Sequence, residues 1–263
     1  MMSAGAIRVL GGILAVGVSL WATPPFAQSA DAVVPVTPAR CAHMKQHRVF
    51  NPGAPVACDR LRLLTFGYVG FDGQLHGDAE MVVMDAVADH VLQIFVALRE
   101  RRFPIGSVKL MDHYNGDDDA STAANNTSAL NVRPVSGGGG RLSLHAYGVA
   151  IDLNPLQNPY IVRSGGAMRI DPPSATAYVN RRNLRPGMAE SVIDVFAAHG
   201  FVEWGGRWPN PVDYQHFQVG RGLAYELARL SAPEAHAAFQ RFVQRSRSGR
   251  SGVVDRERTA QPK

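Results

Sequence analysis

Apolar and polar positions follow one another in patterns that predict a series of short elements. Residues 61–69 are rich in β-branched, aromatic and other apolar side chains and predict a strand. Residues 80–102 repeat apolar side chains with helical spacing and predict the longest helix of the chain. The apolar stripe of this helix consists of Val83, Val87, Val91, Ile94, Phe95 and Leu98. Phe103-Pro104 ends the helix, because proline cannot continue it.

The second half of the chain combines further short strands with short helices. Strands are predicted over residues 108–111, 129–135, 148–153 and 214–219. Helices are predicted over residues 188–199, 223–230 and 233–244, and the proline- and glycine-rich residues 155–187 predict loops. Because strands and helices do not alternate regularly, the pattern indicates an α+β fold with a small antiparallel sheet flanked by helices.

The first part of the chain has the pattern of a secretory signal peptide. Arg8 precedes an apolar run from Val9 to Trp21, and small residues follow where cleavage would occur. We interpret residues 1–30 as a signal peptide and expect a secreted or periplasmic protein of a bacterial cell envelope. An uncleaved membrane anchor is the alternative, and it would be the protein's only contact with a membrane.

Composition and charge narrow the classes of partner. The chain is 46% hydrophobic and 19% charged, which is ordinary for a globular protein. The formal net charge is +5 and the pI is about 9.5, values that also occur in nucleic-acid-binding proteins. Much of this excess lies in residues 245–263, where we expect a basic, disordered tail. Nucleic acid is therefore not an expected partner.

The chain has two cysteines, Cys41 and Cys58. In an exported protein, two cysteines close in sequence predict one disulfide that closes a short loop, here within an N-terminal segment of residues 31–60. The alternative is a zinc site that includes His43 and His47, but the spacing matches no common structural zinc pattern.

Two motifs place histidine and aspartate in otherwise apolar sequence. The first, SLHAYGVAIDLN, contains His145 and Asp152, and the second, DYQHFQ, contains Asp213 and His216. Two imidazoles and one carboxylate suit a catalytic zinc with an open fourth position, which leaves Asp213 for proton transfer. Arg133, on a neighbouring predicted strand, would stabilise an oxyanion. The spacing equally allows buried, hydrogen-bonded histidines, a turn cap at Asp152 and an ordinary ion pair at Arg133.

Together the two motifs resemble a known family. The pattern Ser-x-His-x-x-Gly-x-Ala-x-Asp ends at Asp152, and Asp-x-x-His-Phe begins at Asp213; both are similar to the D-alanyl-D-alanine metallopeptidases. These enzymes share a superfamily with lysostaphin-type peptidases and the hedgehog signalling domain. The resemblance covers roughly residues 105–220 and implies a hedgehog/D-Ala-D-Ala-peptidase-like fold within a metallopeptidase domain, residues 61–244.

The resemblance also implies a set of metal ligands and a base. One zinc ion per chain would be held by His145, Asp152 and His216, with Asp213 as the general base. Many relatives carry glutamate at the position of the base, and Glu203 is a competing candidate in this chain.

Four further residues receive roles from the same resemblance. Arg133 would stabilise the transition state, and Ser143 would lie near the substrate. Trp204 and Trp208, in a segment of aromatic and glycine residues, would line the cleft.

The resemblance implies an exported zinc peptidase that cuts bonds next to D-amino acids in peptidoglycan stem peptides or other D-amino-acid peptides. Metal-activated water would attack directly, and the chain has no Ser-x-x-Lys motif for the serine route. A non-catalytic cell-wall-binding module on the same fold is the main alternative, and a metalloenzyme of another substrate class is the second. Action as a carboxypeptidase, dipeptidase or endopeptidase depends on the loops that close the cleft, residues 112–128 and 155–187.

Overall fold

A computed structural model describes residues 1–2, 31–135 and 139–259, with side chains as far as residue 248. All but two residues of the predicted signal peptide, residues 1–30, lie outside the described residues. Among the helices that are described, none is both long enough and apolar enough to cross a membrane.

The larger sheet is built on two long antiparallel strands, β2 (Leu61–Gly70) and β3 (Leu75–Met84). β1 (Ala32–Pro35) pairs antiparallel with β2, and β4 (Pro104–Ile105) adds a short parallel pair at the other end of β2. The strand predicted over residues 61–69 is therefore confirmed.

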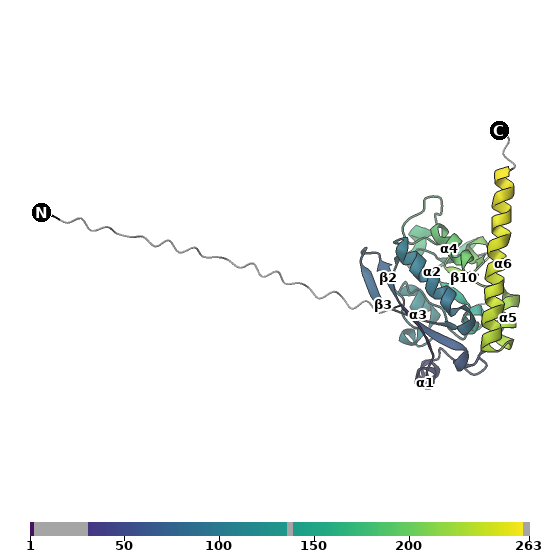
Figure 1. The fold of residues 1–263 in the computed structure, drawn as a ribbon. Helices are drawn as coiled ribbons and strands as arrows, with labels where there is room; N and C mark the ends of the chain where they lie inside the picture. The colour runs from purple at the N-terminus through teal and green to yellow at the C-terminus, as the bar shows by residue number, and fades with distance from the viewer. Residues whose placement is uncertain (3–30, 136–138, 260–263) are drawn as a thin grey trace.

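The predicted helix over residues 80–102 is wrong in its first part. β3 continues to Met84, a 3-10 turn covers Asp85–Val87, and helix α2 covers Ala88–Glu100. Residues 81–84 are four consecutive buried apolar residues, a pattern typical of a strand that is covered on both faces. α2 lies against β2 (Figure 1). It buries the second half of the predicted stripe, and Phe95 stacks on Phe66 with 4.3 Å between the ring centroids.

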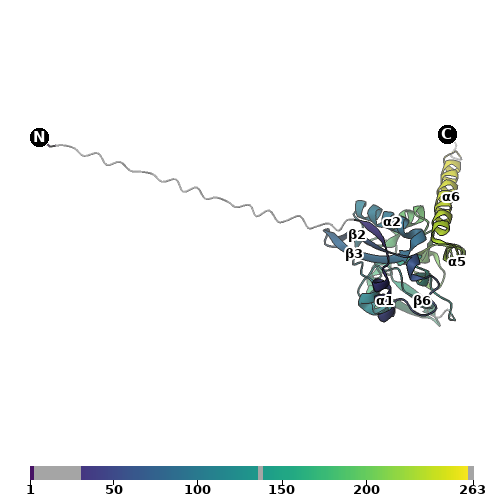
Figure 2. The same ribbon diagram turned by 60° about the horizontal axis from the view of Figure 1, so that its bottom comes forward.

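Two smaller antiparallel sheets follow. The first has the order β5-β10-β8 and consists of β5 (Ala150–Asp152), β10 (His216–Gln218) and β8 (Glu203–Trp204). The second has the order β7-β6-β9 and consists of β7 (Ala167–Asp171), β6 (Tyr160–Ser164) and β9 (Val212–Asp213). The region of residues 155–187, predicted as loop, thus contains a β-hairpin. In Figure 2, β6 lies on the side of the molecule away from α2.

The predicted strands over residues 108–111 and 129–135 are not regular strands. Met111 begins a 3-10 turn, Met111–Tyr114, and no regular strand is formed by the other residues of the two segments. In and beside them are isolated bridges that join Ser107 with Asn126, Ser128 with Asp152, and Pro134 with Leu142. The segments are too short and irregular to add full strands, but their backbone groups still pair with the site region.

The other helices are short, apart from the last. They are α1 (Pro38–Gln46), α3 (Asp118–Ala123), α4 (Ile193–Ala198), α5 (Arg221–Arg229) and α6 (Ala232–Thr259). Figure 1 shows α6 along one edge of the molecule, beside α5. α6 runs through residues 245–259, for which the sequence predicted a disordered tail, and the arginines there are good helix formers.

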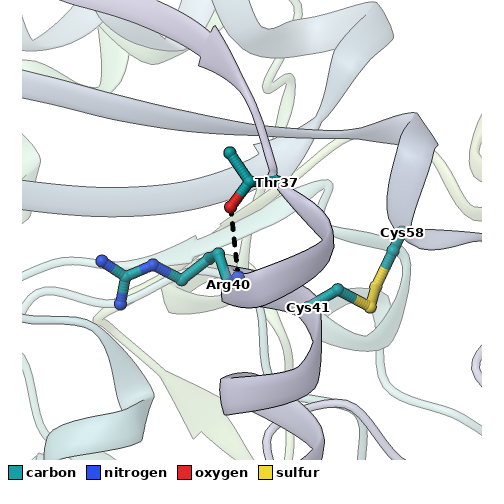
Figure 3. Close-up of a disulfide and its surroundings, with 4 residues drawn as sticks. All are labelled: Thr37, Arg40, Cys41 and Cys58. Atoms are coloured by element: carbon teal, nitrogen blue, oxygen red, sulfur yellow. Dashed lines mark hydrogen bonds between the residues drawn. A yellow bond between two sulfur atoms is a disulfide. The ribbon is translucent and has the colours of Figure 1, made fainter.

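A disulfide joins Cys41, on α1, to Cys58 (Figure 3). Thr37 caps α1 by accepting a hydrogen bond from Arg40 N at 3.1 Å. His47 is occupied elsewhere, through a 2.7 Å hydrogen bond between its Nδ1 and Asn115 Oδ1. The cysteines therefore form the predicted covalent link between α1 and the start of β2. The whole is an α+β fold with small antiparallel sheets and flanking helices, which confirms the predicted fold class.

Candidate metal centre

The pairing of β5 with β10 brings the two sequence motifs together. In this antiparallel pair, His216 stands directly opposite Asp152. His145 lies just before β5, in the 3-10 turn Leu144–Tyr147. Gly148 ends that turn at φ 65°, a left-handed conformation that favours glycine, and so returns the chain toward β5.

Three side chains converge on one point. His145 Nε2 lies 3.0 Å from Asp152 Oδ2, and His216 Nδ1 lies 3.0 Å from Asp152 Oδ1. The two facing imidazole nitrogens are 3.2 Å apart. All three residues are buried, and they form a group that could hold a metal ion.

The outer nitrogen of each imidazole has a partner that fixes the ring's tautomer. His145 Nδ1 lies 2.6 Å from the carbonyl oxygen of Ala129, which can only accept, so this nitrogen carries the proton. His216 Nε2 lies 2.8 Å from Gln218 Oε1, and the amide nitrogen of Gln218 donates to Glu203 Oε2. Both inner nitrogens therefore present lone pairs toward the carboxylate of Asp152. With both rings neutral, the three electron-rich groups would repel one another unless a metal ion or a proton lay between them.

The spacing also suits a small divalent ion. Ligands at about 2.0–2.1 Å from a tetrahedral zinc lie about 3.3 Å from one another. The three separations at this site are 3.0, 3.0 and 3.2 Å. The donor set, two neutral imidazoles and one carboxylate with a cavity on the remaining side, fits a catalytic rather than a structural zinc site.

The pKa shifts of Asp152 and His216 also indicate a site that favours positive charge. Burial alone would raise the pKa of Asp152, but the two histidines together hold it below its usual range. Burial alone would lower the pKa of His216, but the hydrogen bond and charge of Asp152 raise it to about 9. The site therefore attracts positive charge, and a metal ion would compete with a proton for it.

A cavity of about 620 Å³ opens over the three ligands. Its lining includes the predicted catalytic and substrate residues Arg133, Ser143, Trp208 and Asp213 as well as the ligands. Among the described residues, Trp204 and Glu203 do not line it. The indole nitrogen of Trp204 donates to Tyr214 O at 2.8 Å. This side chain therefore supports the backbone beside the small sheet and does not line the cleft as predicted.

Asp213 has the environment of a proton-transfer group. Its side chain is buried, and Oδ1 has no hydrogen-bond partner among the described residues. Burial, followed by the nearby carboxylates of Asp152 and Asp118, raises the pKa of Asp213 to about 7, against the opposing charges of His216 and Arg133. A carboxyl group with a pKa near neutrality and a free oxygen suits general base and acid work. Glu203, by contrast, is hydrogen-bonded to Gln218.

Arg133 and Ser143 lie opposite each other on a short hairpin. Ser143 N donates to Arg133 O at 3.0 Å, and Val135 N donates to Arg141 O at 2.8 Å. The guanidinium of Arg133 pairs with Asp118 at 2.6 Å, and its Nε is buried with no hydrogen-bond partner in the part of the chain that the structure describes. The hydroxyl of Ser143 caps the turn that carries His145, accepting from His145 N at 3.3 Å.

Sequence reasoning missed several residues at this site. Gln218 could have been found, because it lies two residues after His216 on one strand and so shares its face. Tyr160 lines the cavity because β6 pairs with β9 and places it opposite Asp213. Nothing in the local sequence predicts that pairing. Arg141 and Arg221 also line the cavity.

Comparison with protein families agrees with this geometry. Residues 136–219 match the family model described as D-alanyl-D-alanine carboxypeptidase. The matched segment is about a third of the chain and contains His145, Asp152, Asp213 and His216. The family resemblance predicted from the motifs is thereby confirmed. A comparison with curated proteins found no match, and a comparison with solved structures found none.

Proposed function

We propose that this chain is an exported, zinc-dependent peptidase that hydrolyses peptide bonds next to D-amino acids in peptidoglycan peptides. The D-alanyl-D-alanine carboxypeptidase family supports the peptide substrate. The convergent His145, Asp152 and His216 support a divalent metal. The disulfide supports an oxidising compartment such as the periplasm or the cell exterior.

Asp213 would carry the proton chemistry. When bound, zinc would polarise the scissile carbonyl and make water more acidic. Asp213 Oδ1 would accept a proton from the attacking water and then donate it to the amide nitrogen as the C–N bond breaks. The products are a carboxylate and an amine, and Asp213 returns to its charged form. A pKa raised to about 7 makes both transfers accessible near neutral pH.

Arg133 would act on the substrate's developing negative charge. It lines the cavity, and its buried Nε has no partner among the described atoms. The pairing with Asp118 holds the guanidinium in place while leaving Nε free. A donor held in place before the reaction stabilises an oxyanion more than a mobile one does.

The single observation that carries the proposal is the unpartnered, buried Oδ1 of Asp213 beside the three-ligand group. A buried carboxylate oxygen without a hydrogen-bond partner costs folding free energy, so its presence beside the three ligands supports a functional role. The alternative, a non-catalytic wall-binding module, has no use for it.

The test is turnover of a synthetic stem pentapeptide ending in D-Ala-D-Ala, and of muropeptides, by the purified protein. We expect cleavage with zinc, loss of cleavage with a chelator and recovery when zinc is restored. Bound zinc of one ion per chain without any cleavage would contradict the peptidase and favour the binding module. Less than one ion per chain after reconstitution would contradict the metal site itself.

A further inference from the structure

The cavity over the metal centre carries charge of opposite sign at its two ends. Four arginines line it, and two of them are neutralised by carboxylates: Arg133 pairs with Asp118 at 2.6 Å, and Arg169 with Asp171 at 3.6 Å. The other two, Arg141 and Arg221, form no ion pair among the described residues.

Strand β10 fixes where the two ends lie. Asp213 precedes the strand and stands opposite Tyr160, and Asp118 contributes to its electrostatic environment. Beyond the other end of β10, the chain enters α5 at Arg221. His216 lies between Asp213 and Arg221 along this run of chain, so these two side chains flank the candidate metal centre from opposite ends of β10.

The two free arginines are held on adjoining pieces of backbone. Arg221 Nη1 donates to Leu142 O at 3.1 Å, next to Arg141 in the chain. Arg141 itself is exposed, and its side chain faces the cavity with Ser143 from the same strand of the hairpin. Glu203 lies close to Gly220, just before α5, but it is hydrogen-bonded to Gln218, and neither Glu203 nor Glu226 of α5 is among the described residues that line the cavity. This end therefore has unneutralised positive charge that faces the substrate space.

The direction of proton transfer decides which half of the substrate, acyl or amine, lies at each end of the cavity. Asp213 would protonate the leaving nitrogen, which places the amine half of the substrate at its end of the cavity. The acyl half then extends toward Arg141 and Arg221. We propose that these two arginines form a carboxylate subsite, so that the preferred substrate is a peptide with a free carboxylate on the acyl side of the scissile bond. This inference rests on the proposed peptidase function and specifies its substrate class.

Four acetylated peptides test the subsite: N-acetyl-L-Glu-D-Ala-D-Ala, its glutamine analogue, and the C-terminal carboxamide of each. We expect the zinc-loaded protein to prefer glutamate over glutamine by about tenfold in kcat/KM, since charge-assisted hydrogen bonds are lost with glutamine. Arg141→Gln and Arg221→Gln should each reduce that preference toward unity, mainly through KM. Arg229→Gln, an exposed arginine at the other end of α5, should keep it.

Two kinetic results would overturn the subsite. One is an equal preference for glutamate in the wild-type protein and in both arginine variants. The other is an arginine effect that follows the C-terminal carboxylate instead of the glutamate, which would place the arginines on the amine side.

Binding measured without turnover separates this inference from the proposed function. Titration calorimetry with Asp213→Asn should show the glutamate peptide binding about tenfold more tightly than the glutamine peptide. Adding Arg221→Gln should remove that difference. If wild-type protein cleaves none of the peptides but this binding difference is found, the peptidase fails and the subsite stands. Equal binding of the two peptides overturns the subsite, whether or not cleavage occurs.

Discussion

At the scale of single residues, the candidate metal centre depends on side chains and carbonyls other than the three proposed ligands. The Ala129 carbonyl and the Gln218 amide each hold one imidazole in the tautomer that turns a lone pair inward. Gln218 is itself oriented by Glu203. The preference for a cation therefore depends on the Ala129 carbonyl and on a second layer of side chains, Gln218 and Glu203, as well as on the three ligands.

Replacing Gln218 with leucine should weaken metal binding while leaving all three ligands in place. The Nε2–H of His216 would lose its acceptor, and the ring would no longer be fixed in one tautomer. We expect zinc affinity to fall by about 10- to 100-fold, measured by competition with a chromogenic chelator. Gln244→Leu, an exposed position on α6, is the matched control and should bind zinc as the wild type does. Unchanged affinity in Gln218→Leu would contradict the role of the second layer.

Asp213 and His216 should separate catalysis from metal binding. Asp213→Ala should keep one zinc ion and lose about 10²- to 10⁴-fold in kcat, because the proton acceptor is gone. His216→Ala should lose the metal, measured as zinc content after dialysis. A fully active Asp213→Ala would move the base to Glu203.

The pH dependence of turnover should report the same carboxylate. Asp213 acts as a base only when deprotonated, and its pKa is raised to about 7, so kcat/KM should fall as the pH drops through this group's pKa. The charge of a bound metal ion lowers that value, which places the acid limb between the ordinary aspartate pKa of about 3.9 and 7. The profile of kcat/KM from pH 4 to 9 measures this limb. An acid limb that is unchanged in Asp213→Glu would assign it to another group.

At the scale of elements, the sequence predicted best where one face or one stripe decides the structure. Residues 61–69 and 214–219 are strands as predicted, although β10 is shorter. The helix predicted over residues 80–102 is wrong at residues 81–84, because a strand buried on both faces has the same apolar run as a buried helix. The contacts of Ala129, Gln218 and Tyr160 with the site depend on pairing between distant segments, which local sequence does not encode.

Gly148 links the site to the large sheet and is a sharp test of that linkage. It adopts φ 65°, and a Cβ there would lie 2.7 Å from Met84 N, an atom that donates to Gly148 O at 2.9 Å. Gly148→Ala should therefore cost about 2 kcal/mol or more of unfolding free energy and weaken zinc binding, because His145 and Asp152 flank the turn.

Gly165→Ala supplies the matched control for this substitution. Gly165 has a similar φ of 56°, but no atom lies within 4 Å of its added Cβ. The loss of unfolding free energy in Gly165→Ala, measured by urea denaturation, reports the cost of the left-handed backbone conformation alone. Equal losses in the two variants would show that the contact with Met84 contributes nothing.

At the scale of the whole molecule, helices α2, α4 and α6 meet at a pair of half-buried histidines. His90 on α2 and His199 after α4 have their Nδ1 atoms 3.2 Å apart, and His90 packs edge-on against Phe239 of α6 at 5.3 Å. Arg247 of α6 donates to Ala198 O at 2.8 Å and adds positive charge nearby. Nothing in the local sequence around His90 indicates this pair, because His199 is more than a hundred residues away.

This histidine pair should make the fold less stable in mild acid. Burial lowers the pKa of His90, and burial with the charge of His90 and Arg247 lowers that of His199 to about 4. The unfolded chain, with a histidine pKa of about 6.5, therefore binds protons that the folded protein excludes, and stability is lost as pH falls from about 6.5 toward 4. His199→Asn should lose less stability than the wild type between pH 7 and 4.5 in urea denaturation, because titrating carboxylates and metal ligands contribute equally to both proteins. His113→Gln, an exposed histidine, is the control and should follow the wild type. Parallel pH curves for His199→Asn and wild type would show that His199 binds protons equally in the folded and unfolded states and does not link stability to pH.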